Sequence, residues 1–279
     1  MAITTSMIKE LRDATSMGIN DCKKALEETG GDFDAAIKVL REKGAAIATK
    51  RASKEANEGM IAAIVTGDAQ NAAMIEINCE TDFVTRNEDF QAFVEELRGE
   101  ALNFESDAMA AGVASKIEDK MASIGEKIMF RRNVKWTVEG TGAIASYIHM
   151  GGKVGVLVEV GCEKAETIES PIFKELAKDL TLHVAAAAPE YLTRDEVPAE
   201  LVEEEKDIAR KQLEDKPANI IDNILVGKIN KYFSQICFIE QGFVKEDKVS
   251  ITNLLAEKGK ELGDTLTVKR YVRYQLGGA

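Results

Sequence analysis

The sequence predicts an α+β protein, with an N-terminal three-helix bundle and a core built from two copies of one β-β-α unit. Apolar residues recur at helical spacing through residues 1–45. A gap-free internal repeat, with an offset of 83 residues from Glu76 to Glu159, relates two later segments that both read as strand, strand and helix. We therefore divide the chain into a bundle (1–45), a linker (46–57), a first core subdomain (58–140) and a second core subdomain (141–279), which an inserted helical hairpin at about 187–235 interrupts.

Three short helices are expected in the bundle, because their apolar residues fall on one face of each helix. Asp32 should cap the third helix and Gly44 should end it. A turn from Ser16 through Met17 to Ile19 joins the first two helices. The predicted core positions are Met7, Ile8, Leu11 and Ala14, then Ile19, Cys22, Ala25 and Leu26, then Phe33, Ala36, Ile37 and Leu40.

This bundle resembles ubiquitin-associated (UBA) domains, which present a small apolar patch. A bundle of this size buries little area, so it serves either as a stability module or as a docking module. Residues 46–57 follow it and are polar and rich in alanine, without an apolar period. We expect a linker here, helical at most at its start, whose basic residues Lys50, Arg51 and Lys54 lie in solvent.

Strand and helix patterns follow the same order in both core subdomains. The first subdomain is predicted to contain strands over 60–65 and 72–77, helices over 88–104 and 115–128, and a strand over 134–138. The second is predicted to begin with strands over 144–149 and 154–160 and a helix over 172–186. His149 ends one of these strands, where a histidine is either a structural hydrogen-bonding group or a contact residue.

The two copies differ most at the turn after their second strand. Thr81, Asp82, Phe83 and Val84 in the first copy become Lys164, Ala165, Glu166 and Thr167 in the second. A turn with a purely structural role could have stayed alike in both copies. The aromatic ring of the first copy either folds back onto its own core or remains outside as an anchor for a partner.

The inserted segment is predicted to form a projecting antiparallel hairpin of two helices. Its helices are expected over 199–214 and 218–236, joined by Asp215, Lys216 and Pro217. The sheet should then resume with a short strand over 236–240 and a helix capped by Ser250. A final strand should place Leu266, Val268, Val272, Tyr274 and Leu276 on one face.

Composition restricts the function. The 279 residues carry a net charge of −12, which argues against a broad nucleic-acid surface. No apolar run is long enough for a membrane span, and the start of the chain has no secretory pattern, so we expect a cytoplasmic protein. The four scattered cysteines read as buried apolar residues. The two histidines have no metal-ligand spacing, and no phosphate-binding or nucleophile motif occurs, so neither a cofactor nor an enzyme active site is expected.

Taken together, these features resemble the bacterial elongation factor Ts family over essentially the whole chain. The segments that carry the resemblance are 8–12 with Met17 and Gly18, 21–26, 79–84 and 147–157. Proteins of this family are guanine-nucleotide exchange factors for the translational GTPase elongation factor Tu. The resemblance implies that Thr81, Asp82, Phe83 and Val84 form the element that disturbs the Mg²⁺ site of the GTPase.

The same resemblance implies secondary partner contacts at Leu11, Met17, His149 and Met150. It leaves open whether the chain forms a homo-oligomer within a complex with the GTPase. Some family members continue into a C-terminal helix that touches the partner, and the end of this sequence at Ala279 leads us to expect that contact to be reduced or absent. The alternative function is a non-catalytic scaffold that binds proteins through the UBA-like bundle.

Overall fold

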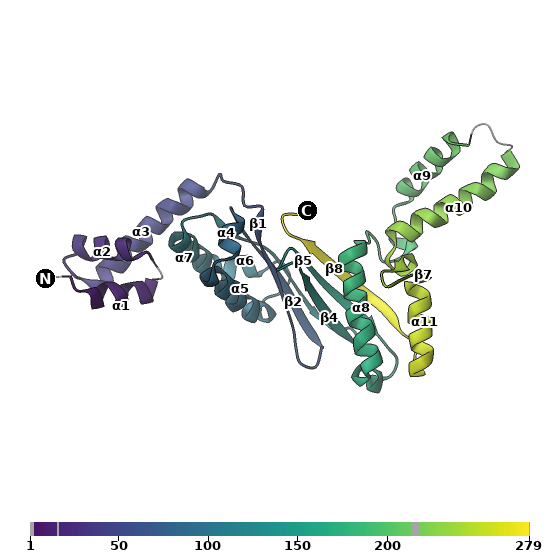
Figure 1. Cartoon of the computed structure of the whole chain (residues 1–279), viewed down its shortest axis with the longest axis horizontal. Coiled ribbons are helices and arrows are strands. Elements are labelled where there is room, and N and C mark those ends of the chain that lie inside the picture. The colour runs from purple at the N-terminus through teal and green to yellow at the C-terminus, as the bar shows by residue number, and fades with distance from the viewer. Residues whose placement is uncertain (1–2, 16, 214–217, 279) are drawn as a thin grey trace.

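The computed structural model describes residues 3–15, 17–213 and 218–278. The molecule is elongated, with a helical bundle at one end, two small antiparallel sheets in the middle and a helical hairpin projecting at the other end (Figure 1). This arrangement confirms the predicted α+β class. Within the described residues, no helix has both the length and the apolar character needed to cross a membrane.

The N-terminal bundle consists of α1 (Thr5–Thr15), α2 (Ile19–Glu28) and α3 (Phe33–Arg51). Asp32 caps α3 as predicted, since its carboxylate accepts the backbone N–H of Ala35 at 3.0 Å. Two predicted core positions are exposed instead: Ala14 of α1, and Ile19, the first residue of α2, which remains 54% exposed. Ser16, in the predicted turn, is outside the described residues. The buried core is Leu11, Met17, Cys22, Ala25, Leu26, Ala36 and Leu40.

The prediction that Gly44 ends the third helix is wrong, because α3 continues to Arg51 and takes in the start of the expected linker. Gly44 instead lets α3 pack closely on α7 (Ala114–Ile124). A Cβ atom at Gly44 would lie 2.8 Å from the Cβ of Ala122. The glycine is therefore needed for close helix packing between the bundle and the core.

The first sheet has the strand order β1-β2-β3, all antiparallel. Short helices on one face cover it, so that Ile75 and Ile77 of β2 pack against Phe90 and Leu97 of α5. The elements in chain order are β1 (Glu58–Val65), β2 (Asn71–Cys79), α4 (Asp82–Thr85), α5 (Glu88–Glu100), η1 (Ala101–Asn103), α6 (Met109–Gly112), α7 and β3 (Ile128–Thr137).

The second sheet has the matching order β4-β5-β8. Ser170 caps α8, with Pro171 in its first turn, and Ser250 caps α11 as predicted by accepting the N–H of Asn253 at 3.2 Å. The elements are β4 (Gly142–His149), β5 (Val154–Gly161), η2 (Ala165–Glu169), α8 (Pro171–Ala187), α11 (Ile251–Leu262) and β8 (Thr267–Gln275). The predicted repeat is thus present, and each copy gains a third strand from later in the chain.

A β-bulge interrupts the third strand of each sheet at the equivalent place. The pairing of β5 with β8 shifts between Glu159 and Val160, and the pairing of β2 with β3 shifts in the same way. Leu266 therefore packs with α8 and α11, whereas Val272 and Tyr274 face the first sheet. The single apolar face predicted for the final strand is wrong, because one extra residue moves all later side chains to the opposite side.

The two sheets pack face to face, with helices on both outer sides (Figure 1). Their central strands, β2 and β5, are buried on both faces. Alternate residues of each central strand point to the covering helices and to the other sheet. The sheet-to-sheet core uses equivalent residues from the two repeats, namely Ile61 and Ile144, Met74 and Leu157, and Trp136 and Tyr274, together with Ala72.

A buried carboxylate of the first repeat joins the two sheets. Glu76 accepts hydrogen bonds from the guanidinium of Arg132 at 2.8 Å and from the backbone N–H of Gly277 at 2.9 Å. The guanidinium of Arg132 also lies 4.0 Å from the ring centroid of Tyr274 on β8. These partners are necessary, because removing the partner of a buried charge costs about 3–5 kcal/mol.

The buried carboxylate of the second repeat makes the equivalent contacts with the first repeat. Glu159 accepts the guanidinium of Arg270 at 2.8 Å and the backbone N–H of Glu139 at 3.0 Å. Arg270 lies 4.5 Å from the ring centroid of Trp136 on β3. Each repeat thus provides the amide and the ring for the buried ion pair of the other, as expected for an approximate two-fold relationship.

The inserted hairpin consists of α9 (Ala199–Lys211) and α10 (Ala218–Ile236). Leu225, Ile229 and Phe233 share one face of α10 and are buried, and Ile221 on the same face is half-buried. The predicted end of the first helix at Glu214 and the joining residues 215–217 lie outside the described residues.

The strand expected over 236–240 is wrong. The chain forms a short 3₁₀ helix, η4 (Phe238–Glu240), and only Cys237 makes an isolated bridge to Tyr191. The N–H of Phe238 donates to the carbonyl of Tyr191 at 2.8 Å, so the backbone is satisfied by the segment before the hairpin instead of by a sheet. The sequence did not predict three further elements in this region, namely η3 (Arg194–Glu196), β6 (Gly242–Phe243) and β7 (Glu246–Ser250).

His183 on α8 is fully buried beneath these elements. Its Nδ1 accepts the backbone N–H of Val244 at 3.2 Å, so Nε2 carries the proton and donates to the side-chain oxygen of Gln241 at 2.9 Å. The ring stacks on Phe238 with 5.5 Å between centroids. Burial lowers the pKa of His183 and keeps the ring neutral.

We predict that His183 makes the stability of the protein depend on pH. A folded-state pKa below the unfolded value of about 6.5 means that the unfolded chain binds the proton first. The free energy of unfolding should be full above about pH 6.5 and fall below it, by at most about 1.4 kcal/mol per pH unit. Urea unfolding should show a shallower pH slope for His183→Gln than for the wild type, and equal slopes would contradict the assignment.

Candidate functional site

The turn after β2 is a four-residue helix, α4, that separates two neighbouring side chains. Val84 is 6% exposed and joins the core beneath α5. Phe83, its neighbour, is 76% exposed. The aromatic ring therefore does not fold back onto its own core, and Val84 anchors the turn that presents it. A large ring held outside the core on a structured turn is suited to enter a pocket on another molecule.

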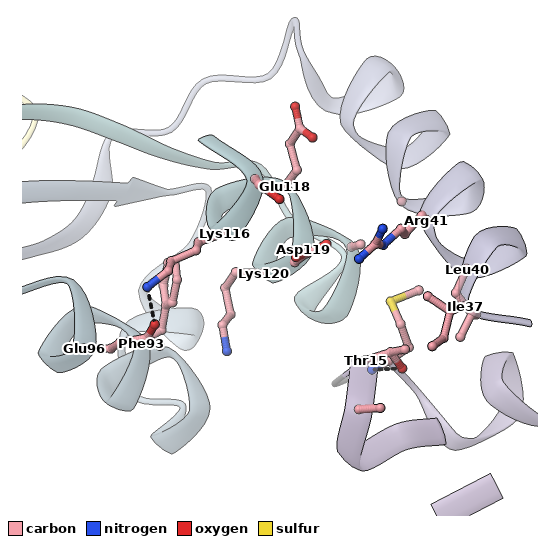
Figure 2. A pocket seen from close by; sticks show the side chains of 15 residues that line it. Thr15, Ile37, Leu40, Arg41, Phe93, Glu96, Lys116, Glu118, Asp119 and Lys120 are labelled. Carbon is pink, nitrogen blue, oxygen red and sulfur yellow. Dashed lines mark hydrogen bonds and ion pairs between the residues drawn. The ribbon is translucent and has the colours of Figure 1, made fainter. Parts of the chain in front are cut away.

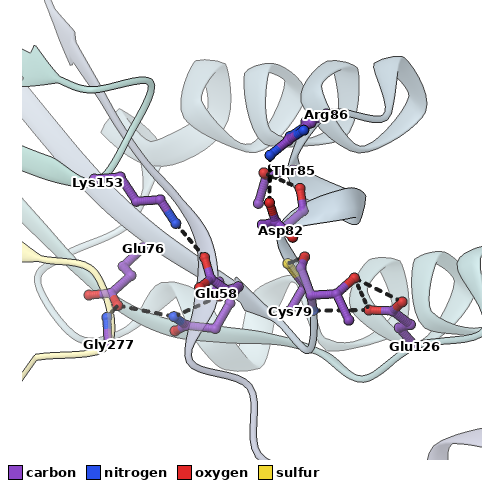
Figure 3. Close-up of polar contacts among 11 residues, drawn as sticks. Glu58, Glu76, Cys79, Asp82, Thr85, Arg86, Glu126, Lys153 and Gly277 are labelled. Atoms are coloured by element: carbon purple, nitrogen blue, oxygen red, sulfur yellow. Dashed lines mark hydrogen bonds and ion pairs between the residues drawn. The ribbon is translucent and has the colours of Figure 1, made fainter.

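The polar groups of α4 are arranged around its backbone (Figure 3). The carboxylate of Asp82 pairs with the guanidinium of Arg86 at 2.6 Å, and the Arg86 side chain is exposed whereas that of Asp82 is about half-exposed. The hydroxyl of Thr85 donates to the carbonyl of Asp82 at 2.7 Å. Asn87 then caps α5 by accepting the N–H of Asp89 at 2.8 Å. Asp82 and Phe83 thus lie next to each other on the outer side of a turn that is bonded at both ends.

Cys79, the last residue of β2, lies under this turn. Its thiol is buried and donates to the carbonyl of Thr81 at 3.2 Å. Burial raises the pKa of Cys79 to about 12, and the nearby carboxylates of Glu126 and Glu58 add to the shift. The thiol is therefore neutral at physiological pH and serves as a packing group, as the sequence predicted.

Thr81 is held by a residue that the sequence analysis did not single out. Its backbone N–H and its hydroxyl both donate to the carboxylate of Glu126, at 3.1 Å (Figure 3). The preceding carboxylate, Glu80, accepts the backbone N–H of Lys127 at 2.6 Å and the guanidinium of Arg51 at 2.9 Å. Residues 80–81 and 126–127 therefore interlock, and the end of α3 is tied to the same point.

The turn between β4 and β5 lies beside β1. The N–H of Ile61 donates to the carbonyl of Gly152 at 2.9 Å, and Lys153 pairs with Glu58, the residue opposite Cys79 in the sheet. Because α4 also packs on β1, this turn and α4 lie at the same end of the first sheet. The second repeat thus contacts the strand on which α4 packs.

The predicted secondary residues divide into two kinds. His149 and Met150 lie on the exposed surface of the β4–β5 turn, Met150 being 72% exposed, and the hydroxyl of Tyr147 lies 2.8 Å from Nδ1 of His149. Leu11 and Met17 are buried in the bundle. Helical spacing had already assigned Leu11 to the bundle core, whereas it did not assign Met17, because burial of an apolar side chain also depends on what packs against it.

A cleft of about 480 Å³ lies between the bundle and the helices of the first subdomain (Figure 2). Met17, Ile37 and Leu40 line its bundle side, and Phe93 lies on the opposite side. Lys116 in this cleft is paired with Glu96 at 2.7 Å. The ammonium of Lys116 also pairs with Glu100, so this one charge is neutralised by carboxylates of the same subdomain. In residues 3–15, 17–213 and 218–278, no group of three or more metal-ligating side chains occurs.

Comparisons with known proteins show that the chain is similar to a single family over nearly its whole length. A sequence model of the family described as Elongation factor TS matches residues 80–278. The elongation factor Ts of Trichlorobacter lovleyi is 44% identical over 292 residues, which cover 99% of this chain and 93% of that protein. That of Nitratiruptor sp. is 42% identical and that of Nitratidesulfovibrio vulgaris 40% identical, each over 99% of this chain and over 94% and 96% of the relative. The similarity therefore extends over the bundle, both repeats and the hairpin.

Proposed function

Because the chain belongs to the elongation factor Ts family, and is thus a translation elongation factor of protein biosynthesis, we propose that it is the guanine-nucleotide exchange factor for elongation factor Tu. It binds the GDP form of that GTPase, promotes release of GDP and allows GTP to load. The observation that carries the proposal is the exposed ring of Phe83 on a turn that its neighbours hold in place. The duplicated copy has no aromatic residue at this position, so the ring is not required by the fold.

The mechanism is differential binding. A GTPase holds its nucleotide through phosphate contacts and through a Mg²⁺ ion that bridges phosphate oxygens. Suppose that the turn of residues 81–84 binds better to a pocket without the metal. Binding of the turn then weakens binding of the nucleotide, and the nucleotide weakens binding of the turn by the same factor. Each tenfold factor requires about 1.4 kcal/mol, and burial of a Phe ring provides about 1.5–3 kcal/mol. Release is accelerated without a bond being made or broken by this chain, which therefore acts as a binding protein and not as an enzyme.

Asp82 contributes a charge beside the ring. Its ion pair with Arg86 is exposed, and such pairs are worth only about 0–1 kcal/mol. The carboxylate can therefore leave Arg86 at little cost when the turn enters the partner, where it competes with the phosphates for Mg²⁺ or for the ligands of Mg²⁺.

The remaining contacts come from two other parts of the chain. His149 and Met150 offer a second exposed contact surface, on the β4–β5 turn of the second repeat. Leu11 and Met17 act through the bundle surface that they support, next to the exposed Ile19. The proposed setting is the cytoplasm, with elongation factor Tu as the partner, without direct contact to nucleic acid or membrane, and with homo-oligomerisation inside the complex left open.

The test is release of labelled GDP from elongation factor Tu, with and without this protein. Substoichiometric amounts should accelerate release, because each molecule can leave one GTPase and act on the next. Stable binding without acceleration would refute exchange and support the scaffold alternative, for which the exposed Ile19 of the bundle is the specific observation.

We predict that Phe83→Ala reduces the stimulated rate of GDP release by about ten- to a hundredfold, since it removes the burial energy of one ring. The unfolding free energy should change by less than about 0.5 kcal/mol, because the side chain is exposed. Glu166→Ala alters the equivalent position of the second repeat and is the matched control, with the rate expected to stay at the wild-type value. Unchanged release by Phe83→Ala would rule out the wedge.

We predict that Asp82→Ala has a weaker effect, which depends on the Mg²⁺ concentration. The loss of activity should be larger at high Mg²⁺ than at low Mg²⁺, because competition for the metal site matters most there. Arg86→Ala is the control, because it breaks the same ion pair and keeps the carboxylate. A loss by Asp82→Ala that is the same at every Mg²⁺ concentration would show that the charge does not act through the metal.

A further inference from the structure

The short helix α4 depends on bonds from outside itself. Isolated helices of a few residues are unstable in water, so a four-residue helix holds its direction only through neighbouring elements. Thr81 is its N-cap residue, yet the Thr81 hydroxyl makes no capping bond to the helix. That hydroxyl and the N–H of Thr81 are used instead on Glu126, which follows α7 at the approach to β3.

The opposite end of the turn is fixed differently. Val84 is buried in the core, and Gln91 of α5 donates to the carbonyl of Thr85 at 2.9 Å. Asp82 and Phe83 lie between these two attachments, and their side chains contact the guanidinium of Arg86, which lies 6.0 Å from the centroid of the Phe83 ring. The carboxylate of Glu126 is therefore the attachment that sets the direction in which the chain enters the helix.

The second repeat has an equivalent carboxylate with no exposed aromatic beside it. Asp264 accepts the N–H of Lys164, which corresponds to Thr81, at 3.1 Å and the hydroxyl of Thr167 at 2.5 Å. These bonds lower the pKa of Asp264 to about 2, the hydroxyl of Thr167 having the largest effect. Both repeats thus hold the turn after their second strand in the same way, and only the first turn carries Phe83.

We infer that Glu126 is a positioning residue for nucleotide exchange: it holds α4 so that Phe83 stands ready to enter the partner. The inference rests on the exchange function proposed above. Without the carboxylate, α4 adopts further orientations, and only the fraction of molecules with the ring in place is competent. The efficiency of exchange then falls by that fraction.

The test combines four variants in the GDP-release assay. Glu126→Ala should slow stimulated release about tenfold, equivalent to about 1.4 kcal/mol. Glu126→Gln keeps an acceptor oxygen for the N–H of Thr81 and should restore most of the rate. Asp264→Asn is the matched change in the second repeat and should leave the rate unaltered. In a Phe83→Ala background, Glu126→Ala should have no further effect, because a residue that acts through the ring cannot act without it.

Amide hydrogen exchange gives a readout that does not depend on activity. Glu126→Ala should speed exchange at residues 81–86 and leave strand residues 71–79 protected. Three outcomes would each overturn the inference. Glu126→Ala could release GDP at the wild-type rate, it could slow release as much in the Phe83→Ala background as in the wild type, or it could leave hydrogen exchange at 81–86 unchanged. If the wild-type protein itself fails to accelerate release, the proposed function fails, and hydrogen exchange still decides whether Glu126 holds the turn.

Discussion

The pair of buried carboxylates between the two sheets is the constraint on which the rest of the structure depends. Glu76 and Glu159 are fully buried, and each accepts hydrogen bonds from an arginine of its own repeat and from a backbone N–H of the other repeat. A rotation of one sheet against the other would break the bond from each carboxylate to the backbone N–H of the other repeat, and a hydrogen bond to a charged group is worth about 1.5–3 kcal/mol. This requirement sets the orientation of the sheets, and with it the position of the β4–β5 turn beside β1 and α4.

Duplication gave this protein two similar turns on one scaffold. Each follows a strand that is buried on both faces, and each is held by a carboxylate placed before the third strand. Because these bonds use the backbone N–H, they tolerate different side chains in the turn. One copy can therefore present Phe83 to a partner while the other presents Glu166, with little consequence for the core beneath.

The N-terminal bundle is joined to this scaffold more firmly than a linker would allow. Gly44 packs against α7, Arg51 pairs with Glu80 at 2.9 Å, and Lys127 donates to the carbonyl of Ala52 at 2.8 Å. These contacts converge next to Thr81, so the bundle and the turn that carries Phe83 share one support. Two surfaces proposed to meet the same partner are thus ordered before binding, which reduces the entropy lost on association.

The sequence by itself determined the α+β class, the repeat, the helical hairpin, the caps at Asp32 and Ser250 and the divergence at Phe83, because these features follow from local spacing and from comparing one copy with the other. Only the tertiary structure decided that Phe83 is exposed, that Met17 is buried, that Gly44 is a packing contact, and that a bulge reverses the face of β8. It also revealed Glu126, whose bond to Thr81 spans 45 residues of sequence. Such pairings leave no periodic pattern in the sequence, because they depend on which distant segments the folded chain brings together.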